Sequence, residues 1–397
     1  MKRIGLLPRI ILAIALGIGA GLVIPEWGIR LFATFNSLFG SFLGFAIPLI
    51  IIGFIAPGIG TMGKEAGKLL GLTTSIAYGS TIGAGLLAFF AAKTLYPTLL
   101  ANQTTHGEFE NPEEVLLEPY FTVDMPPIMG VMTALLIAFT LGLGLAAIKG
   151  DTLQRVLNDF RDIIEKLIDR VIIPLLPLHI FGIFANMTNG GQVGAIMSVF
   201  AKVFVMIIVL HFVYILIQYS VAGSLRQKNP FGMLKKMLPA YFTALGTQSS
   251  ASTIPVTLKH TKTLGVKERV ADFSVPLLAT IHLSGSTITL TSCAMAVMLL
   301  QGEVPTFGTL FPFILMLGIT MIAAPGVPGG AVMAALGLLE SMLGFDSTML
   351  SLMIALYLAQ DSFGTACNVT GDGALTAITD RFVRADQLEQ MGVKKVG

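Results

Sequence analysis

Long uncharged runs recur along this chain, and they constrain its fold more than any other feature. Residues 31–63, 69–92, 125–148 and 203–225 contain no Asp, Glu, Lys or Arg, and each run is long enough to cross a hydrocarbon core of about 30 Å. Hydrophobic residues make up 54% of the 397 residues and charged residues only 12%, which excludes a soluble domain with an ordinary polar surface. We therefore predict an all-α polytopic membrane protein.

Basic residues at the ends of the apolar segments indicate how the chain is oriented. Lys2, Arg3 and Arg9 begin the chain, Lys394 and Lys395 lie near its other end, and positive side chains favour the cytoplasmic side of a membrane. The first segment resembles a signal peptide but lacks a convincing cleavage site, so we expect it to be retained. The sequence thus predicts a multi-pass protein of the cell inner (plasma) membrane with both termini cytoplasmic. A net charge of only +2, without a basic patch among aromatic residues, excludes nucleic acid as a partner.

Two segments that are polar or rich in helix-breaking residues are not predicted to cross the membrane as single helices. Residues 237–258 have basic clusters at both ends, and their centre, LGTQSSASTIP, would be costly against lipid. This pattern predicts a hairpin that enters and leaves on the cytoplasmic face. Residues 304–339 contain AAPGVPGGA, which breaks a helix and predicts a second hairpin from the outside. Opposed hairpins are typical of inverted-repeat secondary transporters, although channels also use re-entrant segments.

The last apolar segment carries a polar stripe. Asp361, Thr365, Asn368 and Asp372 are spaced i, i+4, i+7 and i+11, which places them on one face of a helix. Acidic side chains at that depth cost several kcal/mol, so they face a cavity or a cationic partner. A shorter helix would leave Asp372 at the interface instead. Because no intramembrane Lys or Arg is available, the cation would be a substrate ammonium, a metal ion or a proton.

A second polar stretch, VPLLATIHLSGSTITL at residues 275–290, falls in the middle of the predicted helix between the two hairpins. On a helix, His282 and Ser284 would lie on different faces, which argues against a catalytic pair. The sequence also lacks the GxSxG and HExxH motifs of hydrolases. His179 and His211 lie in uncharged helices and are expected to be buried, hydrogen-bonded histidines.

Three motifs carry a resemblance to a known family. They are GTQSSASTIPVT at 246–257, PGVPGG at 325–330 and DSFGTACNVTGD at 361–372. In this order and spacing, the chain resembles the dicarboxylate/amino acid:cation symporter family, which contains glutamate and neutral amino acid transporters. The resemblance implies eight transmembrane helices plus two re-entrant helical hairpins, assembled as a homotrimer. It also implies an inverted-repeat elevator fold, in which a transport domain moves against a scaffold.

The resemblance also implies how the chain is divided. The expected parts are scaffold helices 1 and 2 (1–70), helix 3 of the transport domain (71–100), an extracellular acidic loop (101–126), scaffold helices 4 and 5 (127–190), helix 6 of the transport domain (191–225), the first hairpin (235–258), helix 7 (268–300), the second hairpin (308–340), helix 8 (346–379) and a cytoplasmic tail (380–397).

Residue by residue, the resemblance implies a substrate site and a cation site. The substrate-binding positions would be Ser249, Ser250, Val327, Gly329, Asp361, Gly364, Thr365 and Asn368. Asp361 would bind the substrate ammonium, while Thr365 and Asn368 would bind its carboxylate. Val327 and Gly329 would lie in the second hairpin tip, which acts as a gate. Asn368 and Asp372 would coordinate Na⁺.

The chain departs from the family pattern at its substrate site. Members that carry acidic substrates typically have arginine where this chain has Gly364, and Gln248 does not replace the charge. An uncompensated substrate carboxylate would cost several kcal/mol. A small neutral amino acid such as serine, threonine or alanine is therefore expected, and QDS at 360–362 resembles the serine/threonine branch.

A second departure concerns the cation. His282 stands where the family has asparagine, and Ser284 stands where it has an aspartate that helps to build a sodium site. Ser80 and Thr81 could still supply hydroxyl ligands there. Three functions follow: Na⁺-coupled symport of small neutral amino acids, proton-coupled amino acid or dicarboxylate symport through His282, and an ion channel or membrane-embedded enzyme.

Overall fold

A computed structural model describes residues 6–64, 68–99, 116–191, 193–324 and 329–383. These residues form helices and no strand, so the all-α prediction is confirmed for this part of the chain. The elements are α1 Leu6–Val23, α2 Glu26–Lys64, α3 Lys68–Leu99, α5 Val131–Ala147, α6 Thr152–Leu167, the π-helical η2 Ile168–Ile172, α7 Ile173–Asn189, α8 Val193–Arg226, α9 Pro230–Thr247, α10 Ser250–Lys262, α11 Glu268–Ile281, α12 Ser284–Leu300, α13 Phe307–Ile322, α14 Gly330–Leu343 and α15 Ser347–Phe382.

Five described segments are long and apolar enough to cross a membrane. They are Glu26–Gly60, Leu69–Leu99, Thr152–Asn189, Ile196–Arg226 and Glu268–Leu300. Shorter apolar helices lie within α1, α5, α13 and α14. The 36-residue helix α15 is not among these segments, and it carries the polar stripe. The protein is thus a multi-pass membrane protein, while eight transmembrane helices remain a prediction.

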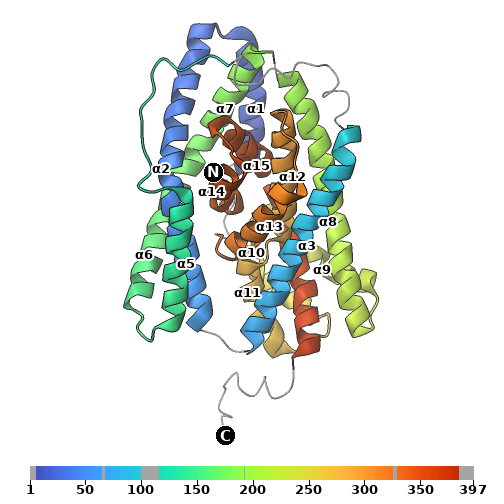
Figure 1. The fold of residues 1–397 in the computed structure, drawn as a ribbon. Helices are drawn as coiled ribbons and strands as arrows, with labels where there is room; N and C mark the ends of the chain where they lie inside the picture. The colour runs from blue at the N-terminus through green and yellow to red at the C-terminus, as the bar shows by residue number, and fades with distance from the viewer. Residues whose placement is uncertain (1–5, 65–67, 100–115, 192, 325–328, 384–397) are drawn as a thin grey trace, which may run out of the picture.

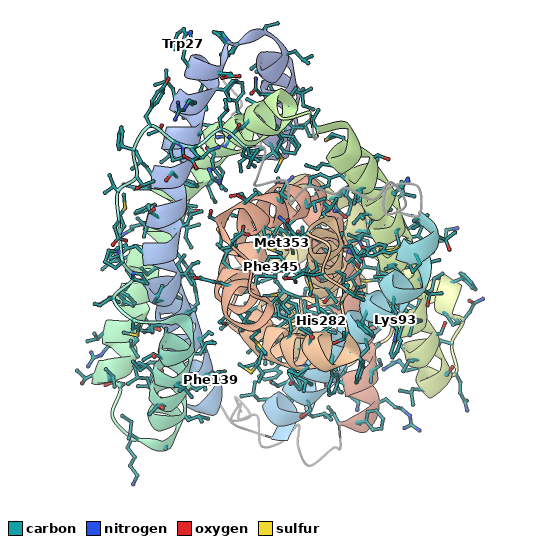
Figure 2. The ribbon with its side chains drawn as sticks, turned by 45° about the horizontal axis from the view of Figure 1, so that its top comes forward. Trp27, Lys93, Phe139, His282, Phe345 and Met353 are labelled. Atoms are coloured by element: carbon teal, nitrogen blue, oxygen red, sulfur yellow. The ribbon has the colours of Figure 1, made fainter. Side chains whose placement is uncertain are left out.

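The helices form two groups (Figure 1). In the first group, α2 packs against α5, α6 and α7, and α1 packs against α7. In the second group, α15 lies at the centre and contacts α8, α9, α10, α11, α12 and α14, while α3 packs against α12 and α13. Figure 2 shows His282, Phe345 and Met353 inside the second group and Trp27 at the rim of the first. The division of the chain into a scaffold and a transport domain stays a prediction.

The described end of the loop before α5 is fastened to the first group. The backbone of Leu117 exchanges two hydrogen bonds with the Asn186 side chain, with N–H to Oδ1 at 3.0 Å and Nδ2 to O at 3.2 Å. Three residues on, the N–H of Tyr120 donates to Thr34 Oγ1 at 2.9 Å, and the Arg30 guanidinium lies 4.9 Å from the Tyr120 ring centroid. The described end of this acidic loop is thus anchored on α2 and α7, while residues 100–115 lie outside the described part.

Among the described residues, a hydrogen bond between α7 and α15 joins the two groups. His179 Nε2 on α7 lies 2.8 Å from Ser351 Oγ on α15, and His179 is only 2% exposed. A cavity of about 340 Å³ borders this contact and is lined by α2, α7 and the start of α15. His179 is thus a buried, hydrogen-bonded histidine, as the sequence predicted.

The first predicted hairpin is a pair of packed helices, α9 and α10. Gln248 adopts a left-handed conformation with φ of 54° and ends α9. Ser249 then caps α10, because its side chain accepts a hydrogen bond from the N–H of Ser252 at 3.3 Å. At the other end of α10, Lys236 Nζ donates to the carbonyl of Thr263 at 2.9 Å, which suits the negative end of the helix dipole. The hairpin spans 230–262, longer at both ends than the expected 235–258.

The second predicted hairpin consists of α13 and α14, which also pack together. Thr306 Oγ1 caps α13 by accepting from the N–H of Thr309 at 3.2 Å. Gly329 precedes α14 with φ of +77°, and a Cβ there would lie 2.9 Å from Leu358 Cδ2. The positive φ favours glycine at this position, and a larger residue would also displace the Leu358 side chain. Val327 lies outside the described residues.

The predicted helix 268–300 is interrupted. α11 ends at Ile281 and α12 begins at Ser284, with His282 at φ −109°, ψ 97° and Leu283 at φ −119°, ψ 51°. The expectation of a continuous helix is wrong at these two residues. Both are buried, at 1% and 8% exposure, which fits the rule that irregular backbone at membrane depth must be enclosed by protein.

Candidate functional site

The polar stripe of α15 is buried inside the second group. Asp361, Thr365, Asn368 and Asp372 are 6%, 6%, 2% and 0% exposed, respectively. The helix is continuous to Phe382, so the four residues share one face. The alternative of a shorter helix with Asp372 at the interface is therefore wrong.

Asp361 meets the tip of the second hairpin. Its Oδ2 accepts a hydrogen bond from the backbone N–H of Gly329 at 2.7 Å. The structure thus brings together two of the predicted substrate residues, one from the stripe and one from the predicted gate. The partner is a neutral backbone donor, so Asp361 keeps its capacity to bind a cationic group.

Asn368 caps the broken end of α12. Its Oδ1 accepts from the N–H of Gly285 at 2.7 Å and of Ser286 at 3.4 Å, and its Nδ2 donates to Ser286 Oγ at 3.1 Å. The first N–H groups of a helix lack partners within the helix, and this amide supplies them. Asn368 therefore has a structural function in addition to its predicted roles in substrate and cation binding.

Gly364 lies against the same helix end. A Cβ at Gly285 would collide with the Gly364 carbonyl oxygen and lie 2.6 Å from Cys367 Cβ. A Cβ at Gly364 would lie 3.6 Å from the Gly285 carbonyl carbon and from the Ser286 nitrogen. Backbone of α12 therefore covers the position at which acidic-substrate relatives of the predicted family carry arginine.

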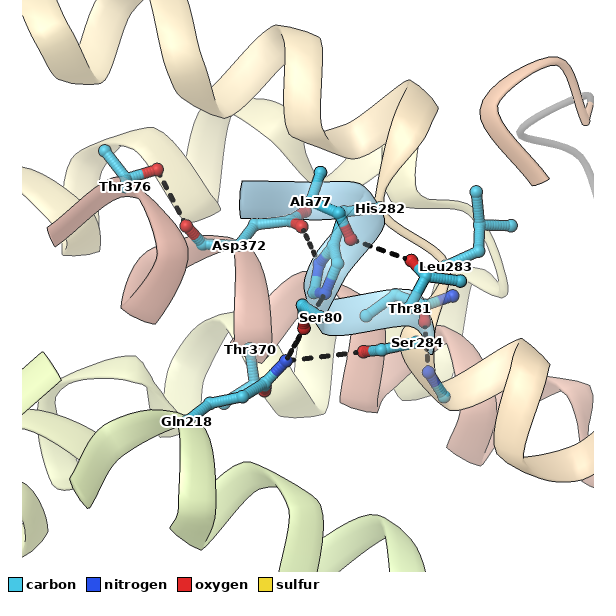
Figure 3. A network of polar contacts seen from close by, with 12 residues as sticks. Ala77, Ser80, Thr81, Gln218, His282, Leu283, Ser284, Thr370, Asp372 and Thr376 are labelled. Carbon is cyan, nitrogen blue, oxygen red and sulfur yellow. Dashed lines mark hydrogen bonds and ion pairs between the residues drawn. The ribbon is translucent and has the colours of Figure 1, made fainter. Parts of the chain in front are cut away.

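Asp372 pairs with the histidine of the helix break. His282 Nδ1 lies 2.8 Å from Asp372 Oδ1, and both side chains are fully buried. The other oxygen, Oδ2, is buried without a hydrogen-bond partner among the described residues. In the sequence analysis only Lys and Arg were considered as partners of the acids within the chain. The chain supplies the imidazole of His282 to Asp372. Figure 3 shows this contact at the centre of a larger network.

The other side of the His282 ring faces α3 and α8. Its Nε2 lies 3.0 Å from Ser80 Oγ and 3.3 Å from Gln218 Nε2. Gln218 Nε2 also donates to Ser80 Oγ at 3.1 Å and to Ser284 Oγ at 3.4 Å. His282 and Ser284 thus share a partner, contrary to the expectation that they lie on different faces, because the backbone between them is not helical.

For the remaining predicted site residues, the described contacts lie mainly within or next to their own helices. Thr81 donates its hydroxyl to the carbonyl of Ala77 at 3.0 Å, within its own helix. Ser249 serves as the cap described above, and Ser250 is 7% exposed at the start of α10, which packs against α15. Among the described residues, no group of three or more His, Cys, Asp and Glu could hold a metal ion.

Sequence reasoning missed the contribution of α8. Gln218 is 4% exposed, and the hydroxyl of Tyr214 donates to the backbone carbonyl of Ser80. His211, on the same helix, lies with its Nε2 3.0 Å from the Gly285 carbonyl oxygen, as expected for a buried, hydrogen-bonded histidine. These three residues are spaced i, i+3 and i+7 in an apolar helix, and this spacing could have revealed a polar face.

A model of the sodium:dicarboxylate symporter family matches residues 6–382. The chain is similar to the serine/threonine transporter SstT of Acinetobacter baumannii strain AYE, with 28% identity over 394 residues that cover 96% of this chain and 97% of the relative. The SstT proteins of strains AB307-0294 and AB0057 show the same identity and coverage. The similarity therefore extends over both groups of helices.

Proposed function

Because the chain belongs to the sodium:dicarboxylate symporter family, we propose that it carries small neutral L-amino acids, such as serine, threonine and alanine, across the membrane together with Na⁺. The family and the similar transporters make the protein a secondary symporter and not an enzyme. The observation that carries the proposal is Asp361, a buried carboxylate that accepts the backbone N–H of Gly329 at the tip of the second hairpin.

The substrate follows from the charges that the site offers. A zwitterionic amino acid needs an anion for its ammonium, which Asp361 supplies, and donors for its carboxylate, which Thr365 and backbone amides can supply. A side-chain carboxylate would need a further cation, and Gly364 offers none. Relatives named as serine/threonine transporters support the same choice.

The coupling cation would bind at Asp372. The Oδ2 atom of this residue is a buried carboxylate oxygen without a hydrogen-bond partner in the described chain, and Na⁺ prefers such oxygens. Asn368 would contribute less than the resemblance implies, because its Oδ1 already accepts from the N–H of Gly285. When bound, Na⁺ would balance the second acidic charge of the stripe.

Movement would follow the division of the helices. We propose that the group built around α15 moves as the transport domain against α1, α2, α5, α6 and α7, by an elevator mechanism in a homotrimer. The hydrogen bond between His179 and Ser351 would break in this movement.

Proton coupling is the second candidate. The 2.8 Å contact between His282 and Asp372 provides a buried imidazole next to the proposed cation site, and histidine is the side chain best suited to exchange protons near neutral pH. In this alternative the proton replaces Na⁺ while the substrate site is unchanged.

Uptake by purified protein in liposomes tests the proposal. We expect labelled serine to accumulate when an inward Na⁺ gradient is imposed without a pH gradient, and unlabelled threonine or alanine to compete. Accumulation that follows only a pH gradient would favour the second candidate. Serine movement that equilibrates but never accumulates under either gradient would contradict coupled transport.

A further inference from the structure

The amide nitrogen of Gln218 lies where three acceptors converge. Ser80 Oγ, His282 Nε2 and Ser284 Oγ are 3.1, 3.3 and 3.4 Å from Gln218 Nε2, respectively. They come from α3, the break between α11 and α12, and the start of α12 (Figure 3). We call this group of four side chains the amide corner. All its members except Ser80 are at most 4% exposed.

The chemistry of the amide corner does not suit a sodium ion. A sodium site requires lone pairs that converge on an open position, whereas here an NH₂ group with two protons occupies the point of convergence. His282 Nδ1 faces Asp372, so an Nδ1–H tautomer leaves Nε2 as the acceptor that Gln218 needs. The two protons of the Gln218 amide are thus shared among three acceptors and fill the point on which they converge.

Packing fixes the amide in this position. A Cβ at Gly371 would lie 2.6 Å from Gln218 Oε1 and 2.9 Å from both Gln218 Nε2 and His282 Cε1. Only a residue without a side chain lets the amide and the imidazole approach α15 this closely. The Ser80 hydroxyl also lies 3.1 Å from the Tyr214 hydroxyl. A further hydrogen bond therefore holds Ser80 in the amide corner.

We propose that the Gln218 side-chain amide takes the place of a coupling cation, so that the corner formed by Ser80, His282 and Ser284 binds no Na⁺. These are the positions at which the family resemblance implied an additional sodium site. The inference rests on the proposed transport function and adds to it that this carrier couples through fewer cations than a relative with an acidic residue at position 284. The partial positive charge of the amide is permanent and does not leave during the transport cycle.

The test is to change the charge of the corner without changing its shape. Gln218→Glu replaces the donor by a carboxylate of the same size, which should create a sodium site together with the oxygens of Ser80 and Ser284. Gln218→Leu is the matched control, because it removes the donor and adds no charge. The readout is the thermal denaturation midpoint of substrate-free protein against Na⁺ concentration, with K⁺ used to hold ionic strength constant, since a bound ligand stabilises by mass action.

We expect the midpoint of Gln218→Glu to rise more steeply with the logarithm of Na⁺ concentration than that of wild type, by the equivalent of one additional ion. Gln218→Leu should keep the wild-type slope at a lower midpoint. A lower slope in Gln218→Leu would show that Gln218 itself ligates sodium, and an unchanged slope in Gln218→Glu would show that the corner cannot be converted. Either result would overturn the proposal.

A second pair of variants keeps the proposal testable if Gln218→Glu does not fold. Ser284→Asp alone should gain no sodium, because its carboxylate accepts from the amide of Gln218, while Ser284→Asp combined with Gln218→Leu should gain one. Equal sodium slopes in these two proteins would contradict the inference. A wild-type protein whose denaturation midpoint does not change with Na⁺ would count against the proposed function. The difference in slope between the variants would still decide the role of Gln218.

Discussion

Two buried carboxylates on one face of α15 have partners of different kinds. Asp361 is held by the backbone N–H of Gly329 at the tip of the second hairpin, at 2.7 Å. Asp372 is held by the His282 side chain, at 2.8 Å, inside the centre of the second group. The first partner is a backbone N–H at the residue that precedes α14. The second partner is fixed by Ser80 and Gln218 behind it.

We propose different functions for these chemically identical side chains. A carboxylate with a neutral backbone donor would exchange that donor for a substrate ammonium. A carboxylate whose partner belongs to the core cannot do so without disturbing α11, α12 and α3. The comparison therefore predicts that changes near Asp361 alter substrate binding and that changes near Asp372 alter stability and cation response.

The largest expected effect is on stability, from His282→Ala. The substitution leaves the buried Asp372 carboxylate without its hydrogen-bond donor, and leaving a buried charged acceptor unsatisfied costs about 3 kcal/mol or more. We expect a clear drop in the thermal denaturation midpoint. Adding Asp372→Asn should recover part of the loss, because the uncompensated charge is gone. A double variant that is no better than His282→Ala would show that the pair is not energetically coupled.

The next effect is on substrate affinity, from Asp361→Asn. The amide keeps the size of the side chain but loses the negative charge that the substrate ammonium requires. A hydrogen bond to a charged group contributes about 1.5 to 3 kcal/mol, so serine binding should weaken about 10- to 100-fold, as measured by calorimetry. Wild-type affinity in this variant would remove Asp361 from the ammonium site.

A smaller effect is expected at the hairpin tip, from Gly329→Ala. The left-handed conformation at φ +77° costs a non-glycine residue about 1 to 2 kcal/mol, and the new Cβ would press on Leu358. Transport should fall about tenfold. Gly344→Ala is the matched control, since it has φ of +71° at the other end of α14 with no neighbouring atom within 4 Å. It should cost similar stability and leave serine affinity unchanged, whereas equal loss of affinity in both variants would contradict a special role for the tip.

Local sequence signals predicted much of this architecture. The hydroxyl-rich GTQSSAS placed the break of the first hairpin, where Gln248 is left-handed, and the i, i+4, i+7, i+11 spacing placed the stripe on one face. These features depend on residues near one another in the chain. The prolines and glycines of 325–330 likewise separated α13 from α14.

The centre of the network could not be predicted in the same way. Residues 282 and 283 are His and Leu, neither of which breaks a helix, and the unwound backbone exists because Asp372, Asn368 and Ser80 satisfy the groups around it. These partners come from 82 to 202 positions away in sequence. For the same reason Gln218 was overlooked, because a single amide in an apolar helix shows its function only when its three acceptors are known.

The central claim is that Asp361 binds the substrate and Asp372 the cation. It is tested most directly by measuring serine affinity at a series of Na⁺ concentrations for wild type, Asp361→Asn and Asp372→Asn. We predict that wild type binds serine more tightly as Na⁺ increases and that Asp361→Asn binds weakly at every concentration. Asp372→Asn should bind serine with an affinity that no longer depends on Na⁺. An Asp372→Asn protein that keeps the full Na⁺ dependence, or an Asp361→Asn protein that loses only this dependence, would contradict the account.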